Sequence, residues 1–427
     1  MYNHRSMKYL LVNAGQLLTF IGPSGPRRGA EMSKTGLCRV GAVLIEDGKI
    51  VTAGSHDLVS RHPQATSARV LDVGGRVVLP GFVDSHSHPV FAAPRLKDFE
   101  LRAQGKGYEQ IAAEGGGILS SVDAVRKTTE DELVSRLGVW AARFIECGTT
   151  TLEAKSGYGL DLDSELKCLR AIRRVAAHTA LELIPTFLGA HAVAPELAHD
   201  PHGYVRRVCE EMLPAVAKEG LARFADVFCD RGYFSEEQAE TVLRAALQHG
   251  LKAKIHAEQL AHSGGAAVAA RVGAVSADHL DHADAADFER LKKAGTVATL
   301  VPAANYFLGL GHYPSGRKLI EAGLPVALAT DFNPGTAPCW NMQFALSLAC
   351  TQLKLTPEEA LCAATVNGAH ALGLGATHGT LEPGKQADLV VLDVQDYREA
   401  CYYFGANLVA LVMKRGAVVH ATQDFRP

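Results

Sequence analysis

The spacing of hydrophobic and polar residues differs between the two ends of this chain and its middle. Toward both ends, over residues 1–75 and 383–427, apolar and polar positions alternate as in half-buried strands. The N-terminal part contains GAVLIEDGKIVTAG, in which Asp47 and Gly48 are typical hairpin-turn residues. The C-terminal part contains ADLVVLDV and NLVALVMKRGAVVH, with a turn beginning at Lys414. We therefore predict a small β-sandwich domain assembled from both termini.

Between these ends, residues 76–382 repeat a strand followed by a helix. The strand candidates are VVLPGFVDSH, TTTLEAKSG, LELIPTFLGAH, ADVFCD, LKAKIHAE, AVSADHLD, TVATLVPA and PVALATDF. Eight strand–helix units over about 300 residues are typical of an α/β fold of the (β/α)8, or TIM, barrel type. A doubly wound open sheet is the alternative. It accounts less well for the number of strands, and no Gly-rich phosphate loop follows the first strand.

Two helices are predicted most clearly within the repeat. Thr129 and Glu132 fit a capping box at the start of the first. Apolar residues then recur at helical spacing at Leu133, Leu137, Trp140 and Phe144. The second helix has the same spacing at Leu166, Leu169, Ile172 and Val175. Both helices favour the alternating barrel pattern.

Composition narrows the class of protein further. Of the 427 residues, 47% are hydrophobic and 21% are charged, with a formal net charge of −3, so no basic field predicts nucleic acid or anionic membrane as a partner. No apolar run reaches the roughly 18 residues needed to span a bilayer. Residues 1–6 are expected to form a poorly ordered extension without a signal peptide. Nine cysteines without a Cys-x-x-Cys pair indicate a reducing compartment, so we expect a cytoplasmic protein.

Candidate metal ligands stand where the predicted strands end. His86 and His88 are two residues apart at the end of the first strand, where alternate side chains share a face. Further polar residues end later strands: His191, His256, Asp278, His279 and Asp331. A surface loop would explain one His-x-His pair in a chain with 18 histidines, but not this recurrence. Barrel chemistry lies at the carboxyl ends of the strands, and imidazole suits zinc and iron.

This set, with the flanking sandwich, resembles the amidohydrolase superfamily. The resemblance implies that His86, His88, His256 and Asp331 bind one divalent metal ion, zinc or iron. Members with two metals add a carboxylated lysine, typically from the fourth strand, and ADVFCD has no lysine. Lys155 stands at the end of the second strand instead, so we interpret it as a structural or substrate-facing charge. A mononuclear site is expected.

The resemblance extends along the whole predicted barrel to one family of this superfamily. The segments that carry it are HSHPVFAAPR, QGKGYEQIAAEGGGI, GTTTLEAKSGYGLDL, FLGAHAV, DVFCDRGYFS, HAEQLAHSGG, SADHL and ATDFNPGT. It implies hydrolysis of the ring amide of 4-imidazolone-5-propanoate to N-formimidoyl-L-glutamate, a step of histidine degradation. It also implies a substrate-binding set, namely Arg95, Tyr158, His191, Gln259, Asn333, Gly335 and Thr336.

Catalytic roles follow as expectations from the same resemblance. Asp331 is expected to move the water proton to the leaving nitrogen. His279 is expected to orient Asp331 or to stabilise the oxyanion. Some family members carry glutamate where this chain has Gln259; an amide cannot take a proton, which argues against a general base there. Arg95 is expected to bind the propionate, and residues 115–117, Gly-Gly-Gly, belong to a candidate lid.

Two other functions remain open at this level. One is a related amidohydrolase acting on another cyclic amide or deaminating a nucleobase; Arg95, Tyr158 and DFNPGT favour the imidazolone. The other is an inactive barrel kept as a scaffold, which the loss of metal ligands would mark, and no ligand position is lost here. The oligomeric state is also open, with a homodimer as the ordinary expectation.

Overall fold

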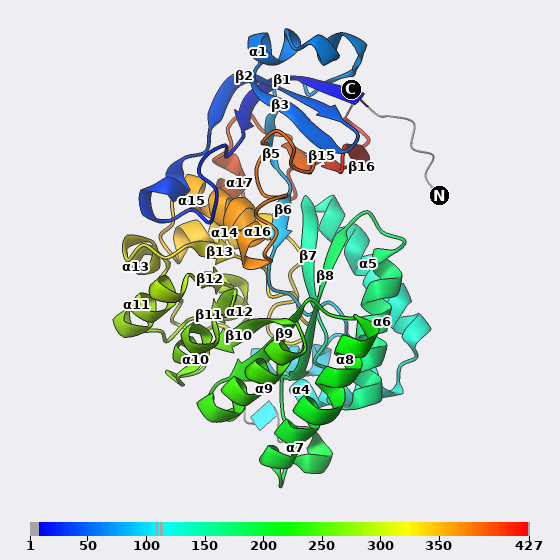
Figure 1. The fold of residues 1–427 in the computed structure, drawn as a ribbon, viewed down its shortest axis with the longest axis vertical. Helices are drawn as coiled ribbons and strands as arrows, with labels where there is room; N and C mark the ends of the chain where they lie inside the picture. Colours follow the sequence, from blue (N-terminus) through cyan, green and yellow to red (C-terminus); the bar gives the residue numbers. More distant parts are fainter. Residues whose placement is uncertain (1–7, 108–109, 112–113, 426–427) are drawn as a thin grey trace.

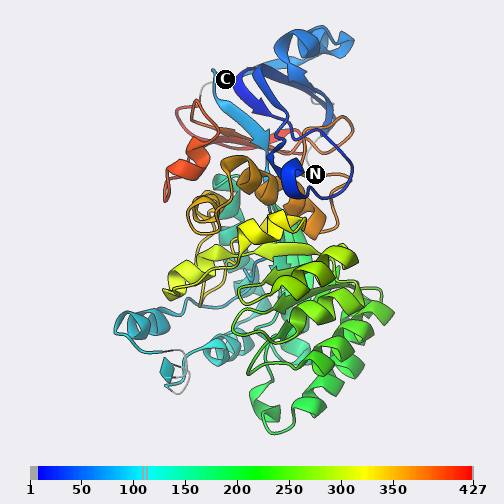
Figure 2. The ribbon, with the colours of Figure 1, turned by 90° about the vertical axis from the view of Figure 1, so that its left-hand side faces the viewer.

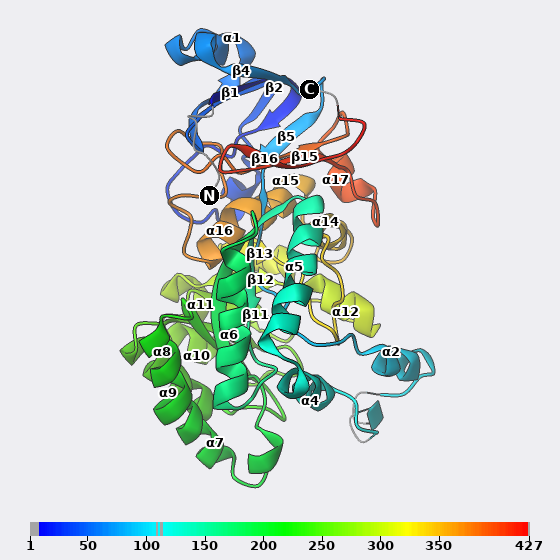
Figure 3. The same cartoon turned by 90° about the vertical axis from the view of Figure 1, so that its right-hand side faces the viewer.

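The computed structural model describes residues 8–107, 110–111 and 114–425, so the expected extension at residues 1–6 lies outside the described residues. Strands from both ends of the chain hydrogen-bond into one mixed sheet at one end of the molecule (Figures 1 and 3). Its order is β16-β15-β14-β5-β1-β2-β3, with β4 beside β1. The strands are β1 (Lys8–Leu18), β2 (Leu37–Glu46), β3 (Lys49–Ser55), β4 (Arg69–Asp72), β5 (Val77–Pro80), β14 (Leu389–Leu392), β15 (Val409–Lys414) and β16 (Ala417–Ala421). The prediction that both termini build one small β unit is confirmed.

Both predicted hairpin turns are present in this sheet. Asp47 and Gly48 join β2 to β3 with φ of 49° and 78°. Arg415 and Gly416 join β15 to β16 with φ of 48° and 73°. Two successive residues at positive φ match the right-handed twist of the strands they connect, which is why glycine serves in both turns.

The middle of the chain forms the predicted barrel of eight parallel strands. These are β6 (Phe82–Asp84), β7 (Thr149–Lys155), β8 (Glu182–Ala190), β9 (Phe224–Cys229), β10 (Lys252–Ala257), β11 (Ser276–His279), β12 (Val297–Leu300) and β13 (Val326–Leu328). Each pairs in parallel with the next along the chain. A parallel bridge between Ser87 and Phe332 brings the first and last strands together, so the ring is nearly closed.

The first barrel strand is shorter than predicted. The run VVLPGFVDSH is divided: Val77–Pro80 (β5) pairs with β1 and β14, and only Phe82–Asp84 joins the barrel. The two parts meet at Gly81, where a Cβ would lie 2.3 Å from Thr150 Cγ2. Because both parts are fully buried, hydrophobicity alone could not separate them. The division into domains at residues 76 and 382 remains a prediction.

Helices surround the barrel on its outside (Figures 1 and 2). Both helices predicted from spacing are confirmed: α5 (Glu130–Glu146) starts with the Thr129 capping box, and α6 (Leu162–Ala176) buries its apolar face. The other helices are α1 (His56–Ser60), α2 (Leu96–Ala103), α4 (Ile118–Lys127), α7 (Pro201–Arg207), α8 (Leu213–Glu219), α9 (Glu236–Gln248), α10 (Gly265–Val272), α11 (Ala285–Ala294), α12 (Pro302–Leu308), α13 (Gly316–Glu321), α14 (Met342–Thr351), α15 (Pro357–Cys362), α16 (Gly368–Ala371) and α17 (Glu399–Tyr402). Short 3-10 or π turns are η1 (Gly29–Ser33), η2 (Pro63–Ser67), η3 (Pro195–Leu197), η4 (Val208–Met212) and η5 (Ala363–Asn367).

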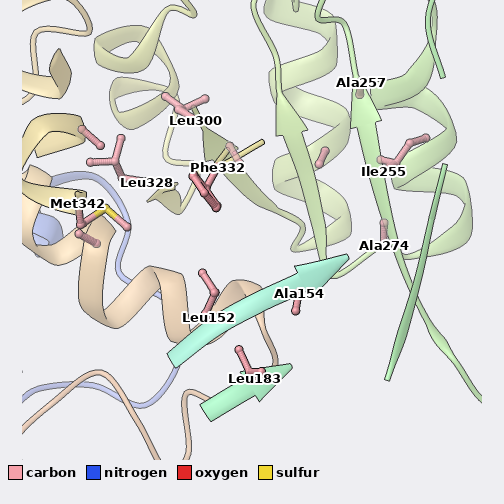
Figure 4. Packing of buried hydrophobic residues seen from close by; sticks show 14 of the residues in the cluster. Leu152, Ala154, Leu183, Ile255, Ala257, Ala274, Leu300, Leu328, Phe332 and Met342 are labelled. Carbon is pink, nitrogen blue, oxygen red and sulfur yellow. The ribbon is translucent and has the colours of Figure 1, made fainter. Parts of the chain in front are cut away.

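One large hydrophobic core holds the barrel strands against these helices. Figure 4 shows part of it, with Leu152 on β7 near Leu183 on β8, and Met342 on α14 near Leu328 on β13. All four side chains are buried. Among the described residues, no helix is long and apolar enough to cross a membrane.

Candidate active site and metal centre

Four side-chain atoms converge at the carboxyl ends of the barrel strands. His86 Nε2 lies 3.4 Å from both His88 Nε2 and Asp331 Oδ1. His88 Nε2 lies 3.2 Å from His256 Nε2 and 3.5 Å from Asp331 Oδ1. Metal–ligand bonds of about 2.0–2.2 Å place neighbouring donors of a tetrahedron about 3.3–3.6 Å apart. These four distances suit neighbouring donors around one metal ion, and the buried His/Asp cluster is typical of an amidohydrolase metal site.

The backbone presents these ligands where strands give way to loops. His86 and His88 follow β6, and His256 lies within β10. His279 ends β11 with φ of 78°, and Asp331 follows β13 with φ of 54°. Positive φ is uncommon for residues other than glycine and is concentrated at functional sites, where the surrounding structure holds the strain.

Buried carboxylates lie beside the Nδ1 atoms of two of the imidazoles. His86 Nδ1 lies 2.6 Å from Asp278 Oδ2, and His256 Nδ1 lies 3.0 Å from Asp226 Oδ2. A proton on Nδ1 leaves the Nε2 lone pair of each ring free for a metal. Carboxylates commonly fix the ring orientation and tautomer of metal-binding histidines in this way.

Burial sets the charge state of the site. It lowers the pKa of His86 and His88 well below the ordinary histidine range, and nearby positive groups lower it further. Neutral imidazole is the form that binds metals. Burial also raises the pKa of Asp331 well above its ordinary range, so its carboxylate needs a positive partner to stay ionised. The donor set thus fits a divalent cation.

Beneath the ligands, lysines and carboxylates form an ion-pair network across the barrel interior. Lys155 Nζ lies 2.6 Å from Asp226 and 2.9 Å from Glu153, and Lys254 Nζ lies 2.8 Å from Glu153. Both ammonium groups also lie within 4 Å of Asp278. Burial opposes the charge on Lys155, but the surrounding carboxylates raise its pKa above the ordinary range. Lys155 is therefore a buried structural cation and not a substrate-facing charge.

Three residues of this network were not predicted from the sequence: Glu153, Asp226 and Lys254. Their signal is present in the chain: charged residues stand at alternate positions in otherwise apolar strands, as in TTTLEAK and KAKIHA. Alternate residues share one face of a strand. A run of charges on that face indicates a polar barrel interior below the metal site.

A pocket is lined in part by the candidate metal ligands His88, His256 and Asp331. The predicted residues among its lining are His88, Arg95, Tyr158, His191, His256, Gln259, His279, Asp331, Asn333 and Thr336. The sequence did not single out the remaining lining residues, which are Ile118, Phe228, Tyr233, Leu260 and Leu308. Phe228 lies on β9, and the others come from loops and helices whose approach to the pocket depends on the tertiary fold.

Arg95 lines this pocket, whereas Gly335 lies against its guanidinium and is not among the lining residues. The Arg95 side chain is 11% exposed, and its buried Nε has no hydrogen-bond partner among the described residues. A Cβ at Gly335 would lie 2.2 Å from the guanidinium carbon, so the arginine can lie here only against a glycine. Asp98 lies 3.8 Å from Arg95 Nη1, beyond hydrogen-bond distance. The guanidinium thus retains donors for a ligand.

Tyr158 and His191 also line the pocket. Their ring centroids are 5.3 Å apart, and the His191 ring stacks on His88 at 5.1 Å. Burial, with the neighbouring charge of His256, lowers the pKa of His191 to about 3, so its ring is neutral. His191 Nδ1 lies 3.0 Å from the Gly157 carbonyl oxygen. Nδ1 must carry the proton, which leaves Nε2 as a hydrogen-bond acceptor.

Asn333 and Thr336 belong to a loop after β13 that is stabilised by hydrogen bonds between its own residues. The Asn333 amide nitrogen donates to the Asp331 carbonyl and to Thr336 Oγ1, at 2.7 and 2.8 Å. Its amide oxygen accepts from the backbone N–H groups of Gly335 and Thr336. Asn333 lines the pocket, but its hydrogen bonds shape the loop that carries Asp331.

Gln259 stands at the pocket beside a glutamate that faces elsewhere. Glu258 accepts hydrogen bonds from the backbone N–H groups of Ser263 and Ala266, so it is held by its own loop. Asp230 accepts from the backbone N–H of Gln259 at 2.7 Å. The residue presented to the pocket is thus the amide.

His279 faces the metal ligands without a protein hydrogen bond. Its ring centroid lies 5.1 Å from that of His86 and 5.2 Å from that of His256. Both ring nitrogens are buried, and neither has a hydrogen-bond partner among the described residues. Burial lowers the pKa of His279 well below the ordinary range. A neutral ring with a free N–H can donate to an oxygen beside the metal.

The predicted lid is only partly described. Residues 108–109 and 112–113, within the segment QGKGYEQIAAEGGGI, lie outside the described residues. Gly117 N–H donates to Asp98 at 2.9 Å, and Ile118 lines the pocket. The lid remains a prediction.

Comparisons with known proteins agree with this geometry. The amidohydrolase family profile matches residues 77–419. The imidazolonepropionase of Solibacter usitatus is 45% identical over 410 residues, covering 96% of this chain and 98% of the relative. That of Symbiobacterium thermophilum is 46% identical over 420 residues, covering 97% and 98%.

Solved structures share the fold at lower identity. An adenosine deaminase from Xanthomonas campestris with bound zinc has a TM-score of 0.72 at 18% identity, covering 98% of this chain and 94% of that one. A guanine deaminase from E. coli has a TM-score of 0.73 at 19% identity, covering 98% and 100%. The chain therefore belongs to the amidohydrolase family and, within it, to the imidazolonepropionases, the cyclic amidohydrolases of histidine degradation.

Proposed function

We propose that one divalent metal ion, zinc or iron, held by His86, His88, His256 and Asp331, serves hydrolysis of 4-imidazolone-5-propanoate to N-formimidoyl-L-glutamate. The distances of 3.2–3.5 Å between neighbouring donor atoms support a single ion. Lys155 supports it as well, because an ammonium bound by carboxylates cannot serve as a bridging ligand to a second metal. When bound, such an ion polarises the scissile carbonyl and lowers the pKa of water to about 7.

The observation that carries the substrate assignment is Arg95. Its guanidinium lies in the wall of the pocket that opens over the metal ligands, and its buried Nε has no protein partner. A carboxylate can accept two parallel hydrogen bonds from a guanidinium. We assign the propionate of the substrate to Arg95, which directs the ring toward the metal ligands.

The remaining pocket residues fit the ring. His191 Nε2 is an acceptor and suits a ring N–H of the imidazolone. Tyr158 packs beside His191 and confines the ring plane. Gln259 can donate and accept hydrogen bonds, so we assign it to orienting the ring amide and not to proton transfer.

The proton path runs through Asp331 in this proposal. Its second carboxylate oxygen takes a proton from the attacking water and delivers it to the ring nitrogen as the carbon–nitrogen bond breaks. His279 donates a hydrogen bond to the oxygen that gains charge. The absence of a hydrogen bond between His279 and Asp331 among the described residues favours this role over orienting Asp331.

We also propose a cellular compartment and an oligomeric state for the enzyme. The nine cysteines are all free, which supports the cytoplasm as its compartment. The homodimer expected from the sequence remains a proposal.

The test is direct turnover by the purified, metal-loaded protein. Consumption of 4-imidazolone-5-propanoate should be at least about tenfold more efficient in kcat/KM than that of hydantoins or nucleobases, a difference of about 1.4 kcal/mol. Preference for a hydantoin or deamination of a nucleobase would overturn the substrate assignment while leaving a metal-dependent hydrolase.

A further inference from the structure

One buried carboxylate outside the pocket holds the segment that carries Tyr158. Glu165 lies in the first turn of α6 and is fully buried. Its Oε1 accepts from the backbone N–H groups of Gly159 at 2.7 Å and Leu160 at 3.0 Å. Its Oε2 accepts from the N–H of Gly157 at 3.1 Å. The backbone is thus fixed on both sides of Tyr158.

The same segment fixes the tautomer of His191. The Gly157 carbonyl receives the His191 Nδ1 proton, while its N–H is held by Glu165. A Cβ at Gly157 would lie 3.0 Å from His191 Nδ1, so the two residues are in close contact. A shift of this peptide would move the acceptor that decides which nitrogen of His191 faces the pocket.

Other side chains leave the segment little freedom. Arg126 Nε donates to the Gly159 carbonyl at 2.8 Å, and Tyr204 Oη lies 3.4 Å from the Leu160 carbonyl. Leu160 has φ of 55°, a conformation that needs such support. Glu165 differs from Arg126 and Tyr204 because it satisfies three N–H groups at once.

We propose that Glu165 is a positioning residue for the reaction, acting through the Gly157 peptide to set the substrate-facing geometry of Tyr158 and His191. This inference rests on the proposed substrate contacts of those two residues. Oxygen acceptors are needed at both carboxylate positions, because Glu165 accepts hydrogen bonds from three backbone N–H groups and from the Ser156 side chain. An amide would place its NH2 against one of these donors.

The test compares Glu165→Gln with Asp163→Asn. Asp163 lies in the same helical turn but is exposed, so its variant removes the same charge without touching the segment. Glu165→Gln should keep its metal and raise KM for 4-imidazolone-5-propanoate about tenfold or more, with a smaller change in kcat. Asp163→Asn should retain wild-type constants. Glu165→Asp, which cannot reach all three N–H groups, should behave like the amide variant.

A second readout does not depend on turnover. Nitrogen NMR of the His191 ring should show the Nδ1-protonated tautomer in wild type and in Asp163→Asn, and a mixture of tautomers in Glu165→Gln. In a double-mutant cycle, the effects of Glu165→Gln and His191→Gln on KM should be non-additive. If the protein does not hydrolyse the imidazolone at all, the proposed function fails, but the tautomer experiment still tests Glu165.

The proposal is overturned if Glu165→Gln lowers only the melting temperature while KM and the His191 tautomer stay as in wild type. It is also overturned if neither Glu165 variant folds, because Glu165 would then be required for stability of the whole barrel.

Discussion

At the residue scale, the buried His/Asp cluster at the strand ends was predictable, but most of the carboxylates beside its imidazoles were not. Histidines at strand ends are visible in the sequence because strands end at turn signals and barrel chemistry gathers at one face. Asp226 lies on β9 beside His256 on the neighbouring β10, whereas Asp278 on β11 meets His86, which follows the distant strand β6. No local sequence pattern indicates which carboxylate meets which imidazole, because these contacts depend on how the strands are arranged in the barrel.

His279→Ala should separate metal binding from catalysis. The ring contacts neither a carboxylate nor a backbone group by hydrogen bonding among the described residues, so its removal should leave the metal ligands in place. Loss of an oxyanion donor costs about 10²–10³ in turnover. Metal content by elemental analysis and kcat on one preparation check this. Metal loss in proportion to activity would make His279 a ligand.

Gln259→Ala should impair substrate binding without abolishing turnover. The amide lines the pocket but cannot accept a proton, so its loss removes orientation and leaves the Asp331 path intact. Steady-state kinetics should show a raised KM and a kcat within about tenfold of wild type, or about 1.4 kcal/mol. A fully metal-loaded Gln259→Ala enzyme that has lost turnover completely would show that the proton path passes through Gln259.

At the element scale, periodic and capped segments were predicted correctly, whereas one fully buried run was predicted as a single strand and forms two. The helix α5 was predicted from its capping box and spacing, which are local features. The run VVLPGFVDSH was predicted as one strand because burial on both faces removes the alternation that marks a boundary. Its division at Gly81 between the two sheets depends on contact with Thr150, which is remote in sequence.

Thr129→Ala should destabilise the protein through α5 alone. Thr129 Oγ1 accepts a hydrogen bond from the Glu132 N–H, and the Glu132 carboxylate accepts one from the Thr129 N–H. Loss of such a cap costs about 1 kcal/mol, which denaturant unfolding can measure. Thr129→Ser keeps the hydroxyl and should restore stability, and neither variant should change kcat. Equal stability of all three proteins would show that the cap contributes nothing here.

At the scale of the whole molecule, the barrel brings the buried His/Asp cluster and the Arg95 guanidinium to one pocket. Closing the barrel between β6 and β13 places the ligands from both ends of the barrel sequence together. Lys155 and Lys254, held by carboxylates below, occupy the interior where further metal ligands would be needed. The chain should therefore bind one ion.

Metal stoichiometry follows from this arrangement. The purified protein should contain one zinc or iron per chain, and removal by a chelator should abolish activity that either metal then restores. His256→Ala should lose the ion, since it removes one of four donors. Two tightly bound ions per chain would contradict the mononuclear site.

The central claim is that Arg95 binds the carboxylate of the substrate, and it is tested most directly by changing each of these two groups. Lysine cannot reproduce a bidentate guanidinium contact, so Arg95→Lys should raise KM for 4-imidazolone-5-propanoate, and Arg95→Ala should raise it further. Both variants should keep their metal, because Arg95 belongs to the pocket wall and not to the donor set.

The decisive measurement is kcat/KM for an analogue without the side-chain carboxylate, in wild type and in Arg95→Ala. The account predicts that wild type uses the analogue poorly and that Arg95→Ala lowers this value little further, because the two groups act as one contact. Equal efficiency of wild type on the analogue and on the parent compound would contradict the account.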